Sequence, residues 1–404
     1  MQKEVLIEKL DHFGRGIINN EKIIFVENAL PEELVEIEKI KETKKYIEAE
    51  TKKIIRRSKN RVEPMCPYYN LCGGCNIMHL KYEEQLKYKE QKVKEILKRF
   101  ANIEEEKVKP IIKSNTKYYR NKITLKVKEK LGLYQKKSYD LVNIDKCLIV
   151  SKKINELIKL LNELNLNNIE EIVIKEAYNE KTIINIKGKN IDKKYLKENL
   201  KSHTENLVIY DNNKKEILLG DGFIIDKIND YYFKISDDSF FQVNRYTTEK
   251  LYNKVKEYAN LKKEERLLDL YCGTGTIGIY LSRDAKEVIG IEINEHAVKN
   301  ANENKKINSI ENISFICSDV GKIKEKYKNI DVVVIDPPRN GLSMEALQNV
   351  LDINPKRIVY VSCDPVTLAR DLNILKDYYE IKEITPTDMF PNTYHVENVC
   401  LLSK

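Results

Sequence analysis

The clearest candidate for chemistry is Cys363, which ends a predicted strand in RIVYVSC and stands just before a predicted helix in DPVTLARDL. The positive end of a helix dipole lowers the pKa of a nearby thiol and favours the thiolate, which is the nucleophilic form of cysteine. The alternative is a small buried apolar residue, the commoner role of a cysteine in a reducing compartment. We predict that Cys363 is a nucleophile.

A glycine-rich turn, LYCGTGTIG, follows a predicted strand and opens a predicted helix. Glycines at Gly273, Gly275 and Gly278 let the backbone turn tightly and approach a ligand, and a helix N-terminus offers unpaired N–H groups. Glu292 ends the next strand, about 20 residues on, where a carboxylate can bind ribose hydroxyls, and Asp319 follows the third strand. These features predict a cofactor site and are compatible with both NAD and S-adenosylmethionine.

The run IDPPRNG after the fourth strand favours S-adenosylmethionine, because Asp-Pro-Pro from Asp336 resembles the substrate-side loop of methyltransferases that act on nucleic-acid bases. With a methyl donor bound nearby, Cys363 would have a catalytic role. C5 of uracil is a poor nucleophile, but thiolate addition at C6 makes an enolate that attacks an electrophilic methyl group. A base must then remove the C5 proton, and Glu397, on a short final strand in TYHVENVCLL, is the candidate; its alternative role is a solvated strand charge. His395 is expected to be a hydrogen-bonded structural residue.

A second group of cysteines lies in CPYYNLCGGC, where Cys66, Cys72 and Cys75 are close in sequence and glycines let the chain wrap a metal. A fourth ligand is needed, and Cys147 in NIDKCLIV is the remaining cysteine outside the catalytic region. Zinc and an iron-sulfur cluster both fit four thiols, and the three-plus-one arrangement favours iron and sulfur. The spacing differs from that of radical S-adenosylmethionine enzymes. The last three cysteines, Cys272, Cys317 and Cys400, fall on strands or their ends, where we expect packing to explain them.

The elements that must position these residues form four predicted regions. Alternating strands and helices over residues 238–404 predict an α/β doubly wound, Rossmann-like domain with a mostly parallel sheet. Alternation of apolar and polar residues over 1–58 predicts a small antiparallel β-barrel, and 59–107 holds the cysteines and a helix. Residues 108–237 predict an α+β middle domain that supplies Cys147.

The composition predicts a multidomain globular protein of the cytoplasm. The chain has 404 residues, 42% of them hydrophobic, and a net charge of +8, which is compatible with a phosphate-bearing partner. No opening apolar run resembles a signal sequence, and no stretch reaches the roughly 18 apolar residues of a membrane-spanning helix. We expect reduced thiols, a monomer, and neither DNA nor a membrane as partner.

Taken together, the motifs resemble one family, the bacterial RNA uracil-C5-methyltransferases, and within it the 23S ribosomal RNA branch. The resemblance covers essentially the whole chain, and the matching stretches follow the order of the family: DSFFQVN, DLYCGTGTIG, IDPPRNGL, VSCDPVTLARDL and DMFPNTYHVENV. The resemblance implies that Cys363 is the nucleophile, that Glu397 is the proton acceptor, and that S-adenosylmethionine is bound by Gln242, Tyr271, Gly273, Gly275, Thr276, Glu292, Asp319 and Asp336. Some family members carry Asn at the position of Thr276, so that contact is replaced by a hydroxyl or lost.

The resemblance also implies a 4Fe-4S cluster on Cys66, Cys72, Cys75 and Cys147, and an amino-terminal TRAM domain, an OB-type fold that binds RNA. The segment YYRNKITLKV, with Arg120 and Lys122, resembles the RNA-facing segment of the family, although an ordinary polar strand face has the same composition. C6 attack requires an unstacked base, which predicts a uridine in a loop of 23S ribosomal RNA. Two alternatives remain at this point: the same chemistry on transfer RNA, and a non-catalytic iron-sulfur RNA-binding factor.

Overall fold

A computed structural model describes residues 3–323, 327 and 329–404 of the chain. The chain forms two compact units, each built from several segments. Unit 1 comprises Met1–Lys92, Leu133–Val142 and Phe390–His395, and unit 2 comprises Val93–Gly132, Asn143–Met389 and Val396–Lys404. Each unit is therefore described by itself.

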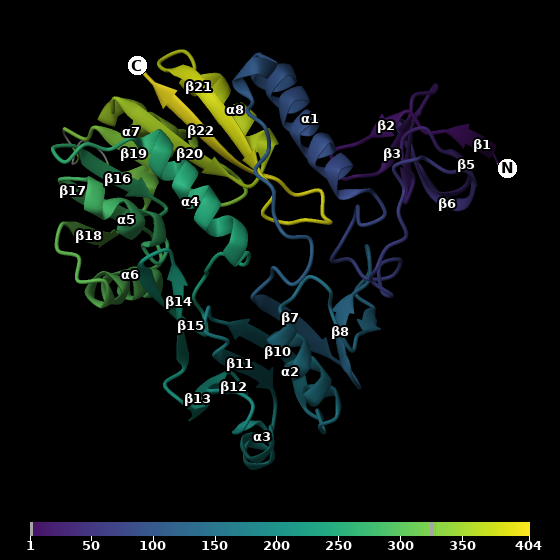
Figure 1. Ribbon diagram of the computed structural model, residues 1–404, viewed down its shortest axis with the longest axis horizontal. Helices are drawn as coiled ribbons and strands as arrows, with labels where there is room; N and C mark the ends of the chain where they lie inside the picture. The colour runs from purple at the N-terminus through teal and green to yellow at the C-terminus, as the bar shows by residue number, and fades with distance from the viewer. Residues whose placement is uncertain (1–2, 324–326, 328) are drawn as a thin grey trace. The chain divides into compact units, whose positions relative to one another are not determined.

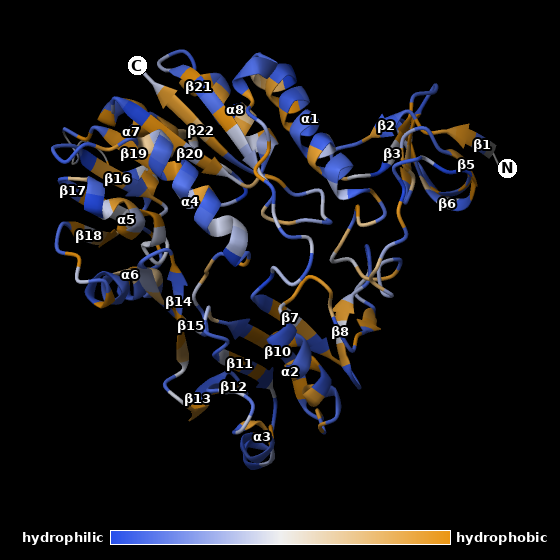
Figure 2. Ribbon diagram, viewed as in Figure 1, coloured by the Kyte–Doolittle hydropathy of each residue, from blue (hydrophilic) through white to orange (hydrophobic). Residues whose placement is uncertain are grey.

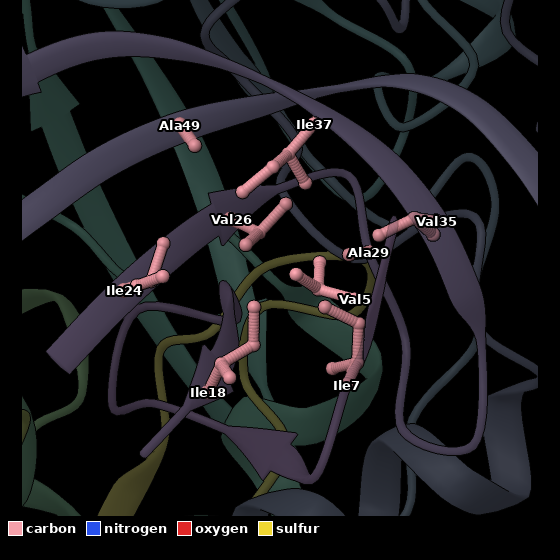
Figure 3. Packing of buried hydrophobic residues seen from close by; sticks show 9 residues of the cluster. All are labelled: Val5, Ile7, Ile18, Ile24, Val26, Ala29, Val35, Ile37 and Ala49. Carbon is pink, nitrogen blue, oxygen red and sulfur yellow. The ribbon is translucent and has the colours of Figure 1, made fainter. Parts of the chain in front are cut away.

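Unit 1 contains a six-stranded sheet in the order β1-β5-β6-β4-β3-β2. Its alternating sequence buries one face of each strand, and nine small and β-branched residues from Val5 to Ala49 pack together there (Figure 3). The prediction of an all-antiparallel arrangement is wrong at one pair, because the β5–β6 hairpin returns β6 beside β4 in the parallel direction. The strands are β1 (Lys3–Leu6), β2 (Lys9–Leu10), β3 (Gly16–Ile18), β4 (Ile23–Glu27), β5 (Leu34–Glu42) and β6 (Tyr46–Arg56).

The cysteine segment follows β6 and leads into helix α1 (Tyr82–Ala101), which the sequence predicts. Acidic residues in its first turn and basic residues in its last turn complement the helix dipole. In unit 1, Lys89 and Lys92 of this helix are buried and donate hydrogen bonds to carbonyls of the 390–395 loop, Lys89 to Phe390 at 3.0 Å and Lys92 to Tyr394 at 3.0 Å. The helix therefore holds a loop that is distant from it in sequence.

The middle of the chain forms a seven-stranded mixed sheet in the order β13-β12-β11-β10-β7-β8-β9, as the predicted α+β composition requires. Helices α2 and α3 and the separate hairpin β14–β15 accompany it. The elements are β7 (Lys122–Val127), β8 (Leu131–Tyr134), β9 (Leu141–Asn143), α2 (Lys152–Asn162), β10 (Ile169–Glu176), β11 (Thr182–Gly188), α3 (Lys193–Leu200), β12 (Asn206–Asp211), β13 (Lys214–Leu219), β14 (Phe223–Ile228) and β15 (Tyr231–Ser236), with the 3-10 turn η1 (Glu105–Lys107) before them.

The carboxyl-terminal part of unit 2 is a second seven-stranded sheet, in the order β18-β17-β16-β19-β20-β22-β21. Its first five strands are parallel, and β22 is antiparallel to both of its neighbours, so β21 runs in the same direction as the first five; this confirms the predicted mostly parallel sheet. Figure 2 shows that these strands are largely hydrophobic, as strands covered on both faces must be (Figures 1 and 2). The elements are α4 (Arg245–Ala259), β16 (Arg266–Leu270), α5 (Thr276–Leu281), η2 (Ser282–Asp284), β17 (Glu287–Glu292), α6 (Glu295–Ile307), β18 (Ile313–Cys317), η3 (Val320–Lys322), β19 (Val332–Ile335), α7 (Met344–Ile353), β20 (Arg357–Ser362), α8 (Pro365–Leu375), β21 (Glu380–Thr387) and β22 (Glu397–Ser403).

Of the helices in the described ranges, none is both long enough and apolar enough to cross a membrane.

Candidate active site

The glycine turn joins β16 to α5 at the carboxyl edge of the catalytic sheet. Tyr271 and Gly275 have left-handed backbones, with φ of 61° and 79°. A Cβ on Gly275 would lie 2.5 Å from the ring of Phe315, and one on Gly278 would lie 2.9 Å from Oδ2 of Asp269. The two glycines are therefore needed for close packing as well as for the turn, which leaves the backbone free to approach a ligand.

Glu292 ends β17 and faces this turn. Its Oε2 accepts a hydrogen bond from the Gly273 backbone N–H at 3.1 Å, and its Oε1 accepts one from Asn294 at 2.8 Å. Asp319 follows β18 and accepts a hydrogen bond from Gly321 at 2.9 Å. Because β16, β17 and β18 are adjacent and parallel, the three loops meet at one edge, as the sequence predicts.

Two further carboxyl groups lie at this edge. Asp269 is fully buried, accepts a hydrogen bond from the Gly278 N–H at 2.8 Å, and has its pKa raised to about 8 by burial. Burial also raises the pKa of Asp336, at the end of β19, to about 7. In a poorly hydrated site the charged form of each carboxyl group is unfavourable. A cationic ligand nearby would favour the charged forms. The site is thus suited to a positively charged cofactor.

Cys363 lies between β20 and α8, as predicted, but its pKa differs from the prediction. Burial and, after it, the neighbouring Glu397 raise the pKa of its thiol to about 12, whereas Arg339 lowers it. Burial outweighs the helix dipole, and the carboxylate of Asp364, which caps α8 by accepting hydrogen bonds from Val366 and Thr367, also raises the pKa. The expected ready-made thiolate is therefore wrong for the free protein.

Glu397 begins β22, which pairs with β20 so that Asn398 lies opposite Ser362. This register brings Glu397 to the neighbourhood of Cys363. The Glu397 side chain is only 9% exposed, and burial raises its pKa to about 8, with Asp336 raising it and Arg339 lowering it. The alternative of a solvated strand charge is wrong. The structure brings Cys363, Glu397, Asp336 and Arg339 together.

Two predicted cofactor contacts are engaged with protein groups. The hydroxyl of Thr276 is 2.8 Å from the Tyr252 hydroxyl, and the backbone carbonyl of Gln242 accepts a hydrogen bond from Asn121 at 3.4 Å. Arg120 donates to the carbonyl of Lys122 at 2.9 Å, and burial lowers the pKa of Lys122. The sequence analysis assigned no role to Asp269 or Arg339. A lone carboxylate in an apolar strand and an arginine directly after Asp-Pro-Pro are the signals that point to them.

The resemblance implies a metal cluster on the second group of cysteines, Cys66, Cys72, Cys75 and Cys147. Cys66, Cys72 and Cys75 lie in unit 1, where the Gly74 N–H donates to Sγ of Cys72 at 3.4 Å, and Cys147 lies in unit 2, where Asn155 bonds its backbone. The thiol donors suit zinc or iron, but within the described ranges no three His, Cys, Asp or Glu side chains form a metal-binding group. No chemical step is therefore derived from a metal. Cys272 and Cys400 are buried as expected, whereas Cys317 is exposed, so packing does not explain it.

The fold and the site define an S-adenosylmethionine-dependent methyltransferase. A solved structure of the Pyrococcus abyssi tRNA (uracil-54, C5)-methyltransferase in complex with S-adenosyl-L-homocysteine is similar over 99% of this chain and 100% of that chain, with a TM-score of 0.82 and 29% sequence identity. The family model described as tRNA (Uracil-5-)-methyltransferase matches residues 81–404. The chain belongs to this family.

Curated relatives agree with this assignment. A protein of Clostridium tetani named as an uncharacterized RNA methyltransferase is 38% identical over 96% of this chain and 93% of its own length. A Staphylococcus aureus protein with a similar name is 35% identical over 98% of this chain and 96% of its own. The chain is therefore an RNA (uracil-C5-)-methyltransferase that uses S-adenosylmethionine.

Proposed function

We propose that this enzyme methylates C5 of a loop uridine in 23S ribosomal RNA, with Cys363 as nucleophile and Glu397 as the base. The observation that carries the proposal is the pairing of β20 with β22, which puts a thiol and a buried carboxyl group side by side at the carboxyl edge of the sheet. Uracil-C5 methylation needs these two groups at one base. Asp336 and Arg339 complete the site.

The thiol must first give its proton to solvent water, and the positive charge of Arg339 favours this because it lowers the pKa of Cys363. Sγ then bonds to C6 of the uracil, and the electron pair of the C5–C6 double bond moves to C5 and O4. Bound S-adenosylmethionine would supply the methyl group to C5, and its sulfur would keep the electron pair of the broken carbon–sulfur bond. The carboxylate of Glu397 takes the C5 proton, the C5–C6 double bond re-forms, and Sγ leaves.

The cofactor is proposed to lie against the glycine turn. Glu292 is placed to accept from ribose hydroxyls, and the buried carboxyls on β16 and β19 favour the cationic donor over its neutral product. The proposed contact residues are Gln242, Tyr271, Gly273, Gly275, Thr276, Glu292, Asp319 and Asp336. The Thr276 hydroxyl can keep its hydrogen bond to Tyr252 and still bond the cofactor, because a hydroxyl has one donor and two acceptor positions.

Covalent trapping tests the proposal. RNA that carries 5-fluorouridine cannot release a proton from C5, so incubation with S-adenosylmethionine should leave a stable protein–RNA adduct. Cys363→Ala should form none, whereas Cys317→Ser, which changes the exposed cysteine at the end of β18, should still form it. An adduct with Cys363→Ala would overturn the mechanism.

The choice of RNA is a separate part of the proposal. The motifs and the cysteine segment favour 23S ribosomal RNA, whereas the similar Pyrococcus abyssi enzyme is described as acting on transfer RNA, which makes transfer RNA the second candidate. Mapping 5-methyluridine in both RNAs from a deletion strain distinguishes them. Loss of a 23S site supports the first candidate, and loss confined to transfer RNA supports the second.

Each of the four regions is proposed to have its own function. RNA is bound by a TRAM domain, residues 1–58, and by the middle domain, residues 108–237. Residues 59–107 carry the cysteines, and residues 238–404 perform the methylation. We also propose that Cys66, Cys72, Cys75 and Cys147 hold a 4Fe-4S cluster with a structural role, because methylation by a thiolate transfers no electron. Iron and sulfide analysis of protein purified without oxygen tests this, with Cys72→Ser expected to lose both; a zinc content equal to that of protein would instead indicate zinc.

A further inference from the structure

Unit 1 carries a groove of about 720 Å³ that no step of the methylation uses. Segments far apart in sequence form it: the loop after β2, strands β4 and β6, the cysteine segment, the 133–137 strand end and the 390–395 loop. We call it the aromatic groove, defined by Phe13, Arg15, Gly74, Tyr134, Lys136 and Tyr394. A volume of this order suits a small organic ligand or one to two nucleotide units.

Two rings of the aromatic groove are exposed, and that of Tyr394 is half-buried. Phe13 is 55% exposed and Tyr134 is 43% exposed, and Phe13 meets Tyr394 edge to face with ring centroids 5.5 Å apart. Exposed phenylalanine is unfavourable in water, and a rigid pair of rings around an open groove is suited to a flat aromatic ligand.

The backbone segments that carry both rings are held by hydrogen bonds. The carboxylate of Asp11 accepts from the backbone N–H groups of Phe13 at 2.9 Å and Arg15 at 2.8 Å, which holds the loop that carries Phe13. The backbone carbonyl of Tyr394 accepts from Lys92. A backbone that is already ordered loses little conformational entropy when a ligand binds beside it.

The 390–395 loop is held at a second point. Gln85 bonds the backbone N–H of Asn392 at 3.0 Å, and the Asn392 carbonyl accepts from Asn76 at 2.9 Å and Ile77 at 3.1 Å. These hydrogen bonds hold the backbone of the loop that carries Tyr394. Glu397 follows this loop in the sequence.

The charges of the aromatic groove largely cancel. Arg15 is paired with Asp11 at 2.7 Å and lies 4.3 Å from the ring centroid of Phe25, and Lys137 is paired with Glu27 at 2.9 Å. Lys136 also lines the groove; its Nζ lies 4.6 Å from the ring centroid of Tyr69, and burial lowers its pKa. The paired charges offer little net attraction for phosphate, so stacking should supply much of the affinity.

We infer that the aromatic groove binds an unpaired base of the RNA substrate, stacked against Phe13 and Tyr394. The inference rests on the RNA methylation proposed above, and it adds a contact outside the uridine that is modified. Single-stranded RNA is bound in this way because every base offers a flat face to an aromatic side chain.

Equilibrium binding tests this inference without catalysis. The probe is a fluorescein-labelled oligouridine of about 12 nucleotides, a length that OB-type folds can cover, and a matched strand of abasic residues. Phe13→Leu keeps the apolar volume but removes the ring. We expect it to weaken oligouridine binding about fivefold and to leave abasic binding unchanged.

Phe100→Leu is the matched control, because Phe100 is 47% exposed and has Arg99 5.2 Å from its ring, as Phe13 has Arg15 at 5.5 Å. It should bind both strands like the unmodified protein. Tyr394→Phe should keep binding, and Tyr394→Leu should lose it to the extent that Phe13→Leu does.

Equal binding of oligouridine by Phe13→Leu, Phe100→Leu and the unmodified protein would overturn the inference, as would equal loss for the abasic strand. The trapping assay on the same variants separates the two proposals. A Phe13→Leu protein that binds normally while the unmodified protein forms the adduct overturns the inference alone. Base-dependent binding without any adduct supports the groove and overturns the proposed mechanism.

Discussion

The catalytic edge of unit 2 and the aromatic groove of unit 1 differ in how their residues are spaced along the chain. Most residues of the catalytic edge lie at the ends of consecutive strands, within short motifs whose residue types indicate the chemistry. The aromatic groove joins segments from several parts of the chain that share no motif, and its rings are ordinary aromatic residues in the sequence. Chemistry is thus encoded locally in this protein, whereas the proposed recognition arises only on folding.

The two regions also differ in electrostatics. At the catalytic edge, Asp269, Asp336 and Glu397 each have a pKa raised by burial, and the thiol of Cys363 is held neutral. In the aromatic groove, Arg15 and Lys137 are paired with carboxylates. Ligands should therefore change the protonation of the first region and leave that of the second unchanged.

The largest expected effect follows from Glu397→Gln at the catalytic edge. The amide cannot take the C5 proton, so turnover should fall about 10²- to 10⁴-fold and the methylated covalent adduct should accumulate on natural RNA. Denaturing electrophoresis with S-adenosylmethionine labelled at its methyl group detects it. Free turnover by this variant would contradict the role of Glu397.

The same variant has a second readout in stability. The folded pKa of Glu397, about 8, lies above its ordinary value of 4.5, so the folded state binds more protons between these values. Stability is therefore lost as the pH rises through this window. Glu397→Gln should lose less stability than the unmodified protein between about pH 5 and pH 8, measured by denaturant unfolding without cofactor.

The pH dependence of adduct breakdown sharpens the comparison of charges. Glu397 must be ionised to take the C5 proton after methyl transfer, so the rate at which the methylated adduct releases RNA should rise with pH through about 8. Arg339 lowers the pKa values of both Cys363 and Glu397. Arg339→Gln should move the rise to higher pH by about half a unit to one unit.

The control is Arg283→Gln, which changes an exposed arginine that lies over the ring of Tyr231. Its profile should match that of the unmodified protein. The role of Arg339 would be refuted by a profile that stays in place with Arg339→Gln.

The glycine turn allows a matched pair of substitutions. Gly273 and Gly275 both have positive φ, but a Cβ on Gly273 meets no atom within 4 Å, whereas one on Gly275 meets the Phe315 ring at 2.5 Å. Gly275→Ala should therefore lower the free energy of unfolding by about 1–3 kcal/mol more than Gly273→Ala. Urea unfolding measures both, and equal losses would show that backbone strain alone sets the cost.

Much of the catalytic edge could be predicted from the sequence because strand periodicity places Cys363, Glu292 and Asp336 at strand ends. The pKa of Cys363 could not, because it depends on burial and on Asp364, which caps α8 against the thiol. The parallel pairing of β4 with β6 was also missed, since alternation gives faces and not strand direction. The aromatic groove had no signal, because folding brings its segments together: Lys89, Lys92 and Gln85 of α1 and the backbone of Asn76 and Ile77 bond the loop that carries Tyr394.

The smallest expected effect is in the loop that presents Phe13. Asp11→Asn keeps an oxygen for the backbone N–H groups of Phe13 and Arg15 but loses the charge paired with the Arg15 guanidinium. A less rigid ring pays more entropy on stacking, so oligouridine binding should weaken about twofold, with the abasic strand unaffected. Asp140→Asn, in an exposed turn of unit 1 with Ser138, is the control and should bind like the unmodified protein. A larger loss for Asp11→Asn than for Phe13→Leu would mean that charge, and not the ring, makes the aromatic groove a site for RNA.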